Sequence, residues 1–212
     1  MHTRNSFKRH LRYGEIALLF ALAATLVWGA VTERRQEDLA EKTVRLHVIA
    51  HSNEAEDQAQ KLLVRDRVLE MAEELLRSSR DAAQAREALR CALPELQQAA
   101  QETLKSAGCD HAVHTYLERT EFPRKSYEGF ALPAGEYTAL RVVIGDGGGA
   151  NWWCVVFPPL CNNAAIDLRE AAVSAGWGSP EVSLVTQENE SYALRFRCIE
   201  LWETLRLWLG KK

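Results

Sequence analysis

The pattern of apolar and polar residues divides the chain into a short leader and a larger folded body. Residues 16–31 (IALLFALAATLVWGAV) are sixteen uncharged residues that follow a basic stretch. Such a run is compatible with hydrocarbon, although a helix needs about 20 residues to cross a bilayer comfortably. This order is typical of a secretory signal peptide or an uncleaved anchor. We expect residues 1–31 to target the membrane and residues 32–43 to be a linker; a buried N-terminal core helix is the alternative.

The body begins with a strand and a helix. Apolar side chains from Val44 to Ala50 alternate with their neighbours at the period of two expected for a strand. Asn53, with Glu56 three residues later, has the form of a helix N-terminal cap, and the helix is predicted to reach about Arg77. Its apolar residues form two nearly opposite stripes, which predicts a helix packed on both sides. The first contains Ala55, Ala59, Leu62, Leu63, Leu69 and Leu76, and the second contains Val64, Val68, Met71, Ala72 and Leu75.

Asp66 falls inside the first of these stripes. A buried carboxylate must be paired, and Arg65 and Arg67 are adjacent basic partners. The position therefore favours a structural ion pair, or a partly exposed acid, over a catalytic residue.

The remaining pattern predicts further helices and strands in one domain, residues 44–209. Pro94 is favoured at the start of a helix and disfavoured inside one, so we expect two helices, 81–91 and 94–107. The glycine run 145–149 is expected to be a hairpin turn. The other expected elements are strands at 111–119, 137–144 and 152–157, a helix at 164–175 and a last helix from Asn189 or Ser191 to about 209. The predicted class is α+β, with a small, mainly antiparallel sheet packed by several helices.

Composition and charge narrow the function. An apolar fraction of 47% excludes an intrinsically disordered chain, and a net charge of −3 argues against a nucleic-acid binder. The charge is uneven, because residues 1–31 carry +3 and the remaining 181 residues carry −6. The leader therefore has the charge of a targeting segment, and the body is acidic.

Candidate catalytic and metal-binding groups do not form a recognisable motif. The glycine run lacks a following Lys-Ser/Thr, which argues against a phosphate loop. His47 and His51 lie four residues apart on a predicted strand, about 13 Å at 3.3 Å per residue, and His111 and His114 add no identifiable third ligand. A Gly-x-Ser-x-Gly elbow and a protease-type cysteine context are also missing. We therefore expect no catalytic residue, cofactor, metal or small-molecule substrate.

The segment from Trp152 to Cys161 (WWCVVFPPLC) is the most unusual part of the chain. Cys154 and Cys161 bracket a Phe-Pro-Pro-Leu turn, where a disulfide is geometrically reasonable and suits an exported domain. Two buried thiols are the alternative. Cys91, Cys109 and Cys198 have no assigned pairing. Rigid aromatic and proline residues are typical of a recognition surface.

Two blocks resemble the stage II sporulation protein R family of endospore-forming Gram-positive bacteria. The first is VRLHVIAHSNEAEDQAQKLLVRDRV, residues 44–68, and the second is LPAGEYTALRVVIGDGGGANWWCVVFPPLC, residues 132–161. Both occur in the family's order behind an N-terminal apolar segment, and the resemblance covers roughly residues 44–209. His51 and Asn53 stand where the family usually has Asn and Asp.

The resemblance implies a signalling protein and not an enzyme. Such proteins are exported from the forespore into the space between the two cells, where the N-terminal segment either is removed or anchors them. There they activate a membrane-embedded aspartic protease of the mother-cell membrane, which processes the pro-form of sigma-E. The contact or contact-supporting residues are expected to be Trp152, Trp153, Phe157, Pro158, Pro159 and Leu160.

Two points stay open at this stage. Both tryptophans would be core residues if the true contact lay on the helices, because Trp side chains pack in cores as well as at interfaces. An exported cell-wall-associated hydrolase or binding module is the alternative function.

Overall fold

A computed structural model describes residues 3–127, 130–160 and 168–186. The first four residues of the predicted helix 164–175 and the whole predicted last helix lie outside these residues. Cys161 and Cys198 also lie outside them.

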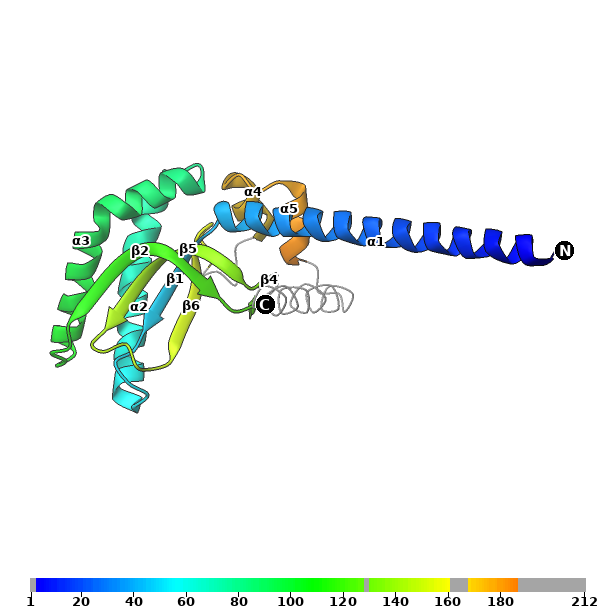
Figure 1. Cartoon of the computed structure of the whole chain (residues 1–212). Helices are drawn as coiled ribbons and strands as arrows, with labels where there is room; N and C mark the ends of the chain where they lie inside the picture. Colours follow the sequence, from blue (N-terminus) through cyan, green and yellow to red (C-terminus); the bar gives the residue numbers. More distant parts are fainter. Residues whose placement is uncertain (1–2, 128–129, 161–167, 187–212) are drawn as a thin grey trace.

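The body is built on a four-stranded sheet with the strand order β2-β5-β1-β6 (Figure 1). The strands are β1 (Val44–Ile49), β2 (Val113–Phe122), β5 (Gly135–Ile144) and β6 (Asn151–Phe157). Strand β1 runs parallel to β5 and antiparallel to β6, while β2 and β5 are antiparallel. The short strands β3 (Lys125–Tyr127) and β4 (Phe130–Leu132) form a separate pair. The predicted α+β class is confirmed, with a mixed, mainly antiparallel sheet.

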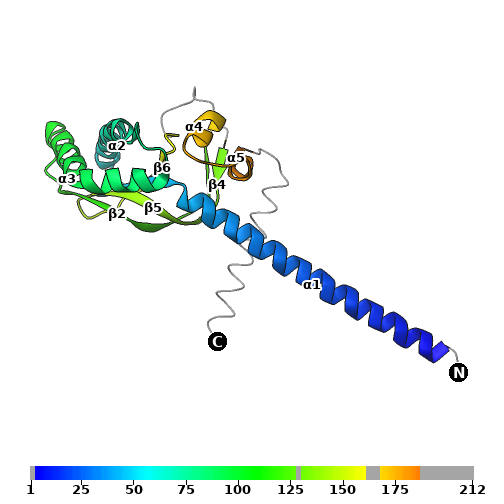
Figure 2. The ribbon, with the colours of Figure 1, turned by 90° about the horizontal axis from the view of Figure 1, so that it is seen from above.

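Two helices, α2 (Ala55–Leu76) and α3 (Ala82–Ser106), cover one face of the sheet (Figure 2). Their apolar faces meet the side chains that alternate strand positions present, because successive residues of a strand point to opposite faces. The main core lies between these layers. It includes Val44, Leu46, Val48, Val64, Val68, Leu89, Leu96, Leu140 and Val142, all fully buried.

A smaller core lies on the opposite side of the sheet. The end of helix α1 (Thr3–Glu41) meets α4 (Leu168–Ser174) and α5 (Ser179–Thr186) there. Lys42 pairs with Glu181, and the Trp177 Nε1–H group donates to the backbone oxygen of Lys42 at 3.2 Å. This core contains Leu39, Leu132, Val155, Ala172, Trp177, Val182 and Val185.

Most of the stretch 32–43, which was expected to be a linker, is helical. Helix α1 continues through this stretch to Glu41, where Leu39 enters the smaller core and Ala40 packs with Phe122 and Tyr137. The apolar run ends at Val31, but the helix continues to Glu41 because Leu39 and Ala40 in its last turn are buried. Leader and body are therefore joined by one continuous helix.

Helix α1 extends from the body as a long rod (Figure 1). Its stretch Glu15–Glu41 contains a segment long and apolar enough to cross a membrane, with a mean hydropathy of 1.9. None of that apolar segment is buried inside the protein, which contradicts the alternative of an N-terminal core helix.

Two details of α2 differ from the sequence prediction. The N-cap is Glu54 and not Asn53; the Asn53 side chain instead accepts a hydrogen bond from the Ala150 N–H at 2.8 Å. The helix is also buried on one face only: Leu69 and Leu76 of the first predicted stripe lie in the main core, whereas Leu62 and Leu63 of the same stripe are exposed. The exposed leucines lie on the surface of the body rather than under a second layer.

The predicted break at Pro94 is also wrong. Residues 82–106 form one helix with Pro94 inside it, and the helix changes direction along its length (Figures 1 and 2). Proline removes one backbone hydrogen bond and bends a helix, but burial on both sides of the bend offsets that loss. Leu89 and Leu96, one on each side, are both fully buried. Asp81, where the sequence predicted the first helix to begin, caps the helix by accepting from the Gln84 N–H at 2.8 Å.

The glycine run 145–149 (the glycine loop) is not a hairpin turn. Strand β1 lies between β5 and β6, so the loop must cross the end of β1 to connect them. The Gly148 N–H donates to the His51 oxygen and the Gly149 N–H to the Ala50 oxygen, each at 3.0 Å. A Cβ atom at Gly149 would lie 2.2 Å from the Ser52 oxygen. The loop is glycine-rich because its backbone rests directly on the backbone that follows β1.

We expect Gly149→Ala to lower the free energy of unfolding by about 2 kcal/mol, since a methyl group forced against fixed backbone must displace it. Gly148→Ala is the matched control, because its Cβ would lie 3.3 Å from the nearest atom, the His51 oxygen. The measurement is denaturant unfolding of the full chain in detergent micelles. Equal losses in the two variants would contradict this account of the loop.

Candidate interaction surface

The predicted contact residues differ in exposure, because successive side chains of β6 point to opposite faces of the sheet. Trp152 is 36% exposed, whereas Trp153 is half-buried and Phe157 is buried in the main core. Beyond the strand, Pro158 is buried and Pro159 exposed, while Leu160 is half-buried against the smaller core. Only Trp152 and Pro159 are well placed for direct contact, and the others lie where they support the surface.

Trp152 lies on the α2 side of the sheet, at the edge strand. The Arg65 guanidinium carbon sits 4.2 Å from the centre of its ring, which is a cation–π contact. Leu62, three residues before Arg65 and therefore its neighbour on the helix surface, is also exposed. We call Trp152, Arg65 and Leu62 the Trp152 patch.

Trp153 points to the opposite face of the sheet and packs there. Its ring stacks on the His47 ring at 3.8 Å and meets Phe122 edge-on at 4.6 Å. His47 Nε2 lies 2.8 Å from Asn151 Oδ1. Burial lowers the pKa of His47, although its hydrogen bond to Asn151 opposes this shift. Trp153 and His47 therefore form a neutral stacked pair that holds β6 against β1.

Arg45, a residue that the sequence did not single out, lies fully buried beneath this aromatic group. Its guanidinium carbon is 4.0 Å from the Phe122 ring centre and 4.9 Å from that of Tyr137, and Nη2 donates to the Tyr127 hydroxyl at 2.7 Å. Burial lowers the pKa of Arg45 and raises that of Tyr137. In the alternating pattern of residues 44–50, Arg45 occupies a position expected to face solvent. Its burial therefore becomes evident only from the tertiary fold.

The cysteines fall into two groups. Cys154 lies buried in β6 and is disulfide-bonded, while Cys91 and Cys109 are free thiols. Cys161 lies outside the described residues, so its pairing with Cys154 stays a prediction.

The histidines considered as metal ligands are brought together in a different combination. His47 faces Trp153 and His114 is exposed. The His51 ring instead stacks on the His111 ring at 3.9 Å, and Asp57 supplies a third ligand group. Asp57 follows His51 by only six residues, but it lies in the first turn of α2 and not on the strand that was searched for ligands.

Asp66 is exposed and pairs with Arg65, with 2.6 Å between Arg65 Nη2 and Asp66 Oδ1. The structural ion pair that the sequence favoured is confirmed, although the carboxylate is not buried. Its partner is the same guanidinium that contacts Trp152.

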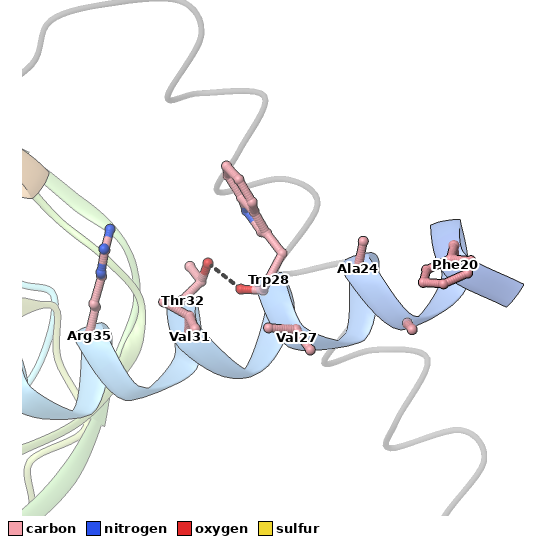
Figure 3. Close-up of a pocket in the computed structure, with 8 residues that line it drawn as sticks. Phe20, Ala24, Val27, Trp28, Val31, Thr32 and Arg35 are labelled. Atoms are coloured by element: carbon pink, nitrogen blue, oxygen red, sulfur yellow. Dashed lines mark hydrogen bonds between the residues drawn. The ribbon is translucent and has the colours of Figure 1, made fainter. Parts of the chain in front are cut away.

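A hollow of about 500 Å³ runs along α1 (Figure 3). Its lining is apolar apart from Thr32 and Arg35, and Figure 3 shows the Thr32 hydroxyl bonded to the Trp28 oxygen of the same helix. Most of the lining belongs to the apolar stretch, including Phe20, Ala24, Val27 and Trp28. These side chains suit contact with acyl chains or another apolar helix, and they bring no reactive group together.

Comparisons with known proteins agree with the resemblance found in the sequence. A sequence model of the family described as Stage II sporulation protein R (spore_II_R) matches residues 40–167. The stage II sporulation protein R of Bacillus subtilis (strain 168) is 34% identical over 152 residues, which are 69% of this chain and 68% of that protein. No solved structure matches the chain. The family match begins in the last turn of α1 and includes the whole sheet and the Trp152 patch.

We expect His47→Gln to remove an acid-sensitive part of the stability. Because burial lowers the pKa of His47 in the folded protein, the unfolded chain binds a proton at this residue more readily below the ordinary His value near 6.5, and stability therefore decreases as the pH decreases through this range. The loss is at most about 1.4 kcal/mol per pH unit. Denaturant unfolding at pH 7.5 and 5.5 measures it, with the exposed His114→Gln as control. A pH dependence unchanged by His47→Gln would contradict the buried neutral state.

Peptide mapping of the full chain under non-reducing conditions is expected to recover Cys154 linked to Cys161. The turn between them is short, which favours closure of this loop over longer-range pairing. Free Cys91 serves as the internal control and should be alkylated without reduction. A Cys154 peptide linked to Cys198 would show that the predicted pairing is wrong.

Proposed function

Because the chain belongs to the stage II sporulation protein R family, and so has a role in sporulation, we propose that it is an exported intercellular signal. In this proposal the body passes from the forespore into the space between the two cells. There it activates the membrane-embedded aspartic protease of the mother-cell membrane that processes the pro-form of sigma-E. The role is one of binding and activation without catalysis by this chain.

Helix α1 supports an action close to a membrane. About ten residues of helix separate the end of the apolar run from the start of β1, which is roughly 15 Å at 1.5 Å per residue. Leu39 and Ala40 are already packed into the body within that distance. While the apolar helix stays in a bilayer, the body is held next to that membrane's outer surface.

The Trp152 patch is the observation that carries the choice of contact surface. It combines Trp152 of the edge strand β6 with Arg65 and Leu62 of α2, and Trp and Arg are among the residues most enriched where binding energy concentrates. The rings and strands behind it are buried, so the patch is presented on a rigid support. Rigid presentation reduces the entropy lost on binding.

Activation requires a difference in affinity between two states of the protease. A ligand shifts an equilibrium only by as much as it binds one state more tightly than the other. We propose that the Trp152 patch binds an extracytoplasmic surface that the protease presents in its active state. Loss of one anchoring side chain then lowers activation without changing the protease itself.

We expect Trp152→Ser to reduce activation about tenfold or more, because a lost anchor of at least about 1.4 kcal/mol changes an affinity by that factor. The assay co-expresses the full chain with the protease and pro-sigma-E of the same organism and follows removal of the pro-segment. Tyr116→Ser is the matched control, since Tyr116 is an exposed aromatic residue on β2, at the other edge of the sheet.

Three outcomes are decisive. Loss with Trp152→Ser alone supports the patch and the signalling role. If processing still requires the chain but is equal in both variants, the contact with the protease must lie elsewhere on the body. Processing at the full rate in the absence of the chain would overturn the signalling proposal.

A further inference from the structure

Three side chains with metal-binding groups, none of them part of the Trp152 patch, meet beside the glycine loop. His51 follows β1, Asp57 lies in the first turn of α2, and His111 precedes β2. One ligand atom from each lies within 4.8 Å of the others. The His111 Nε2 atom is 3.7 Å from Asp57 Oδ1, so the carboxylate faces the ring edge.

The surroundings are those of a partly enclosed polar site. The side chains of His51, Asp57 and His111 are 27%, 11% and 37% exposed, so solvent reaches the group from one side. The Ser52 hydroxyl donates to Asp57 Oδ2 at 2.5 Å, which fixes the carboxylate and leaves Oδ1 directed at His111. A hydrogen bond that orients a ligating carboxylate in this way is a common feature of metal sites.

We propose that His51, Asp57 and His111 bind one divalent transition metal ion, with Zn²⁺ as the best match. Two imidazole nitrogens and one carboxylate oxygen form a common ligand set for zinc, with a fourth position open to water. Magnesium and calcium prefer oxygen ligands alone, so the two histidines disfavour them. Zinc–ligand distances of about 2.0–2.2 Å require the three groups to close by roughly 1 Å.

Metal binding would change the contact between His51 and the glycine loop. The Asp146 N–H donates to His51 Nδ1 at 3.1 Å. A neutral imidazole that accepts at Nδ1 carries its proton on Nε2. Zinc either takes Nδ1 and displaces the Asp146 N–H, or takes Nε2 after the proton has moved to Nδ1, which then no longer accepts. In both cases the Asp146 hydrogen bond is lost and the loop is released from His51.

The release links this site to β6. The glycine loop leads through Ala150 into Asn151 and Trp152, and Lys61 of α2 donates to the Ala150 oxygen at 3.0 Å. We infer that the ion tightens the junction of β1, α2 and β2 and loosens the glycine loop that precedes Trp152. This inference concerns the chain's own chemistry and does not rest on the proposed partner.

The test is a titration of the chelator-treated full chain in detergent micelles with Zn²⁺. We expect one ion bound per chain, a rise in melting temperature, and a Co²⁺ form with the visible absorption of a four-coordinate site. His51→Asn and His111→Asn are expected to weaken Zn²⁺ binding at least tenfold, while His114→Asn, an exposed histidine three residues from His111, leaves it unchanged. Asn at position 51 retains an acceptor for the Asp146 N–H, which keeps the loop in place.

Hydrogen exchange at residues 145–149 gives a second readout, and Zn²⁺ is expected to speed exchange of the Asp146 amide. The absence of binding at micromolar Zn²⁺ would overturn the proposal, as would equal affinity in His111→Asn and His114→Asn. If circular dichroism shows that His111→Asn does not fold, His51→Asn, at a partly exposed position, decides between the outcomes. Binding with an unchanged Asp146 amide would overturn the coupling to the loop.

Discussion

Strand β1 is the constraint on which the rest of the body depends. Its six residues are all buried, and both of its edges are paired, with β5 on one side and β6 on the other. Because a neighbour occupies each edge and each face, everything connected to β1 must enter or leave at its ends. Helix α1 ends just before it, and the chain that joins β5 to β6 must pass over the place where β1 stops.

This arrangement explains why sequence patterns predicted the elements better than their connections. The alternation in β1 and the apolar periods of α2 and α3 arise from local geometry, and the predicted strands were found near their expected positions. The hairpin at 145–149 was wrong because a glycine-rich loop has the same local pattern whether it closes a hairpin or crosses a third strand. The helix through Pro94 and the packed end of α1 depend on burial of Leu89, Leu96 and Leu39, which tertiary contacts alone determine.

The candidate sites, too, could be located only in part from the sequence. The unusual composition of residues 152–161 drew attention to the right segment, but strand alternation decided that Trp152 faces α2 and solvent while Trp153 packs on His47. Arg45 alternates with the apolar residues of β1, as polar surface residues do, yet its side chain lies among aromatic rings. The histidines of the candidate metal site come from segments 60 positions apart, which no local spacing relates.

The continuous passage from α1 into the body fixes orientation as well as distance. A helix transmits rotation about its axis, since each residue advances the chain by about 100° and 1.5 Å. The rotation of α1 about its axis within the bilayer therefore determines which way the edge of the sheet faces outside the bilayer. One residue inserted between the apolar run and Leu39 would turn the whole body by more than a quarter of a circle while barely changing its height.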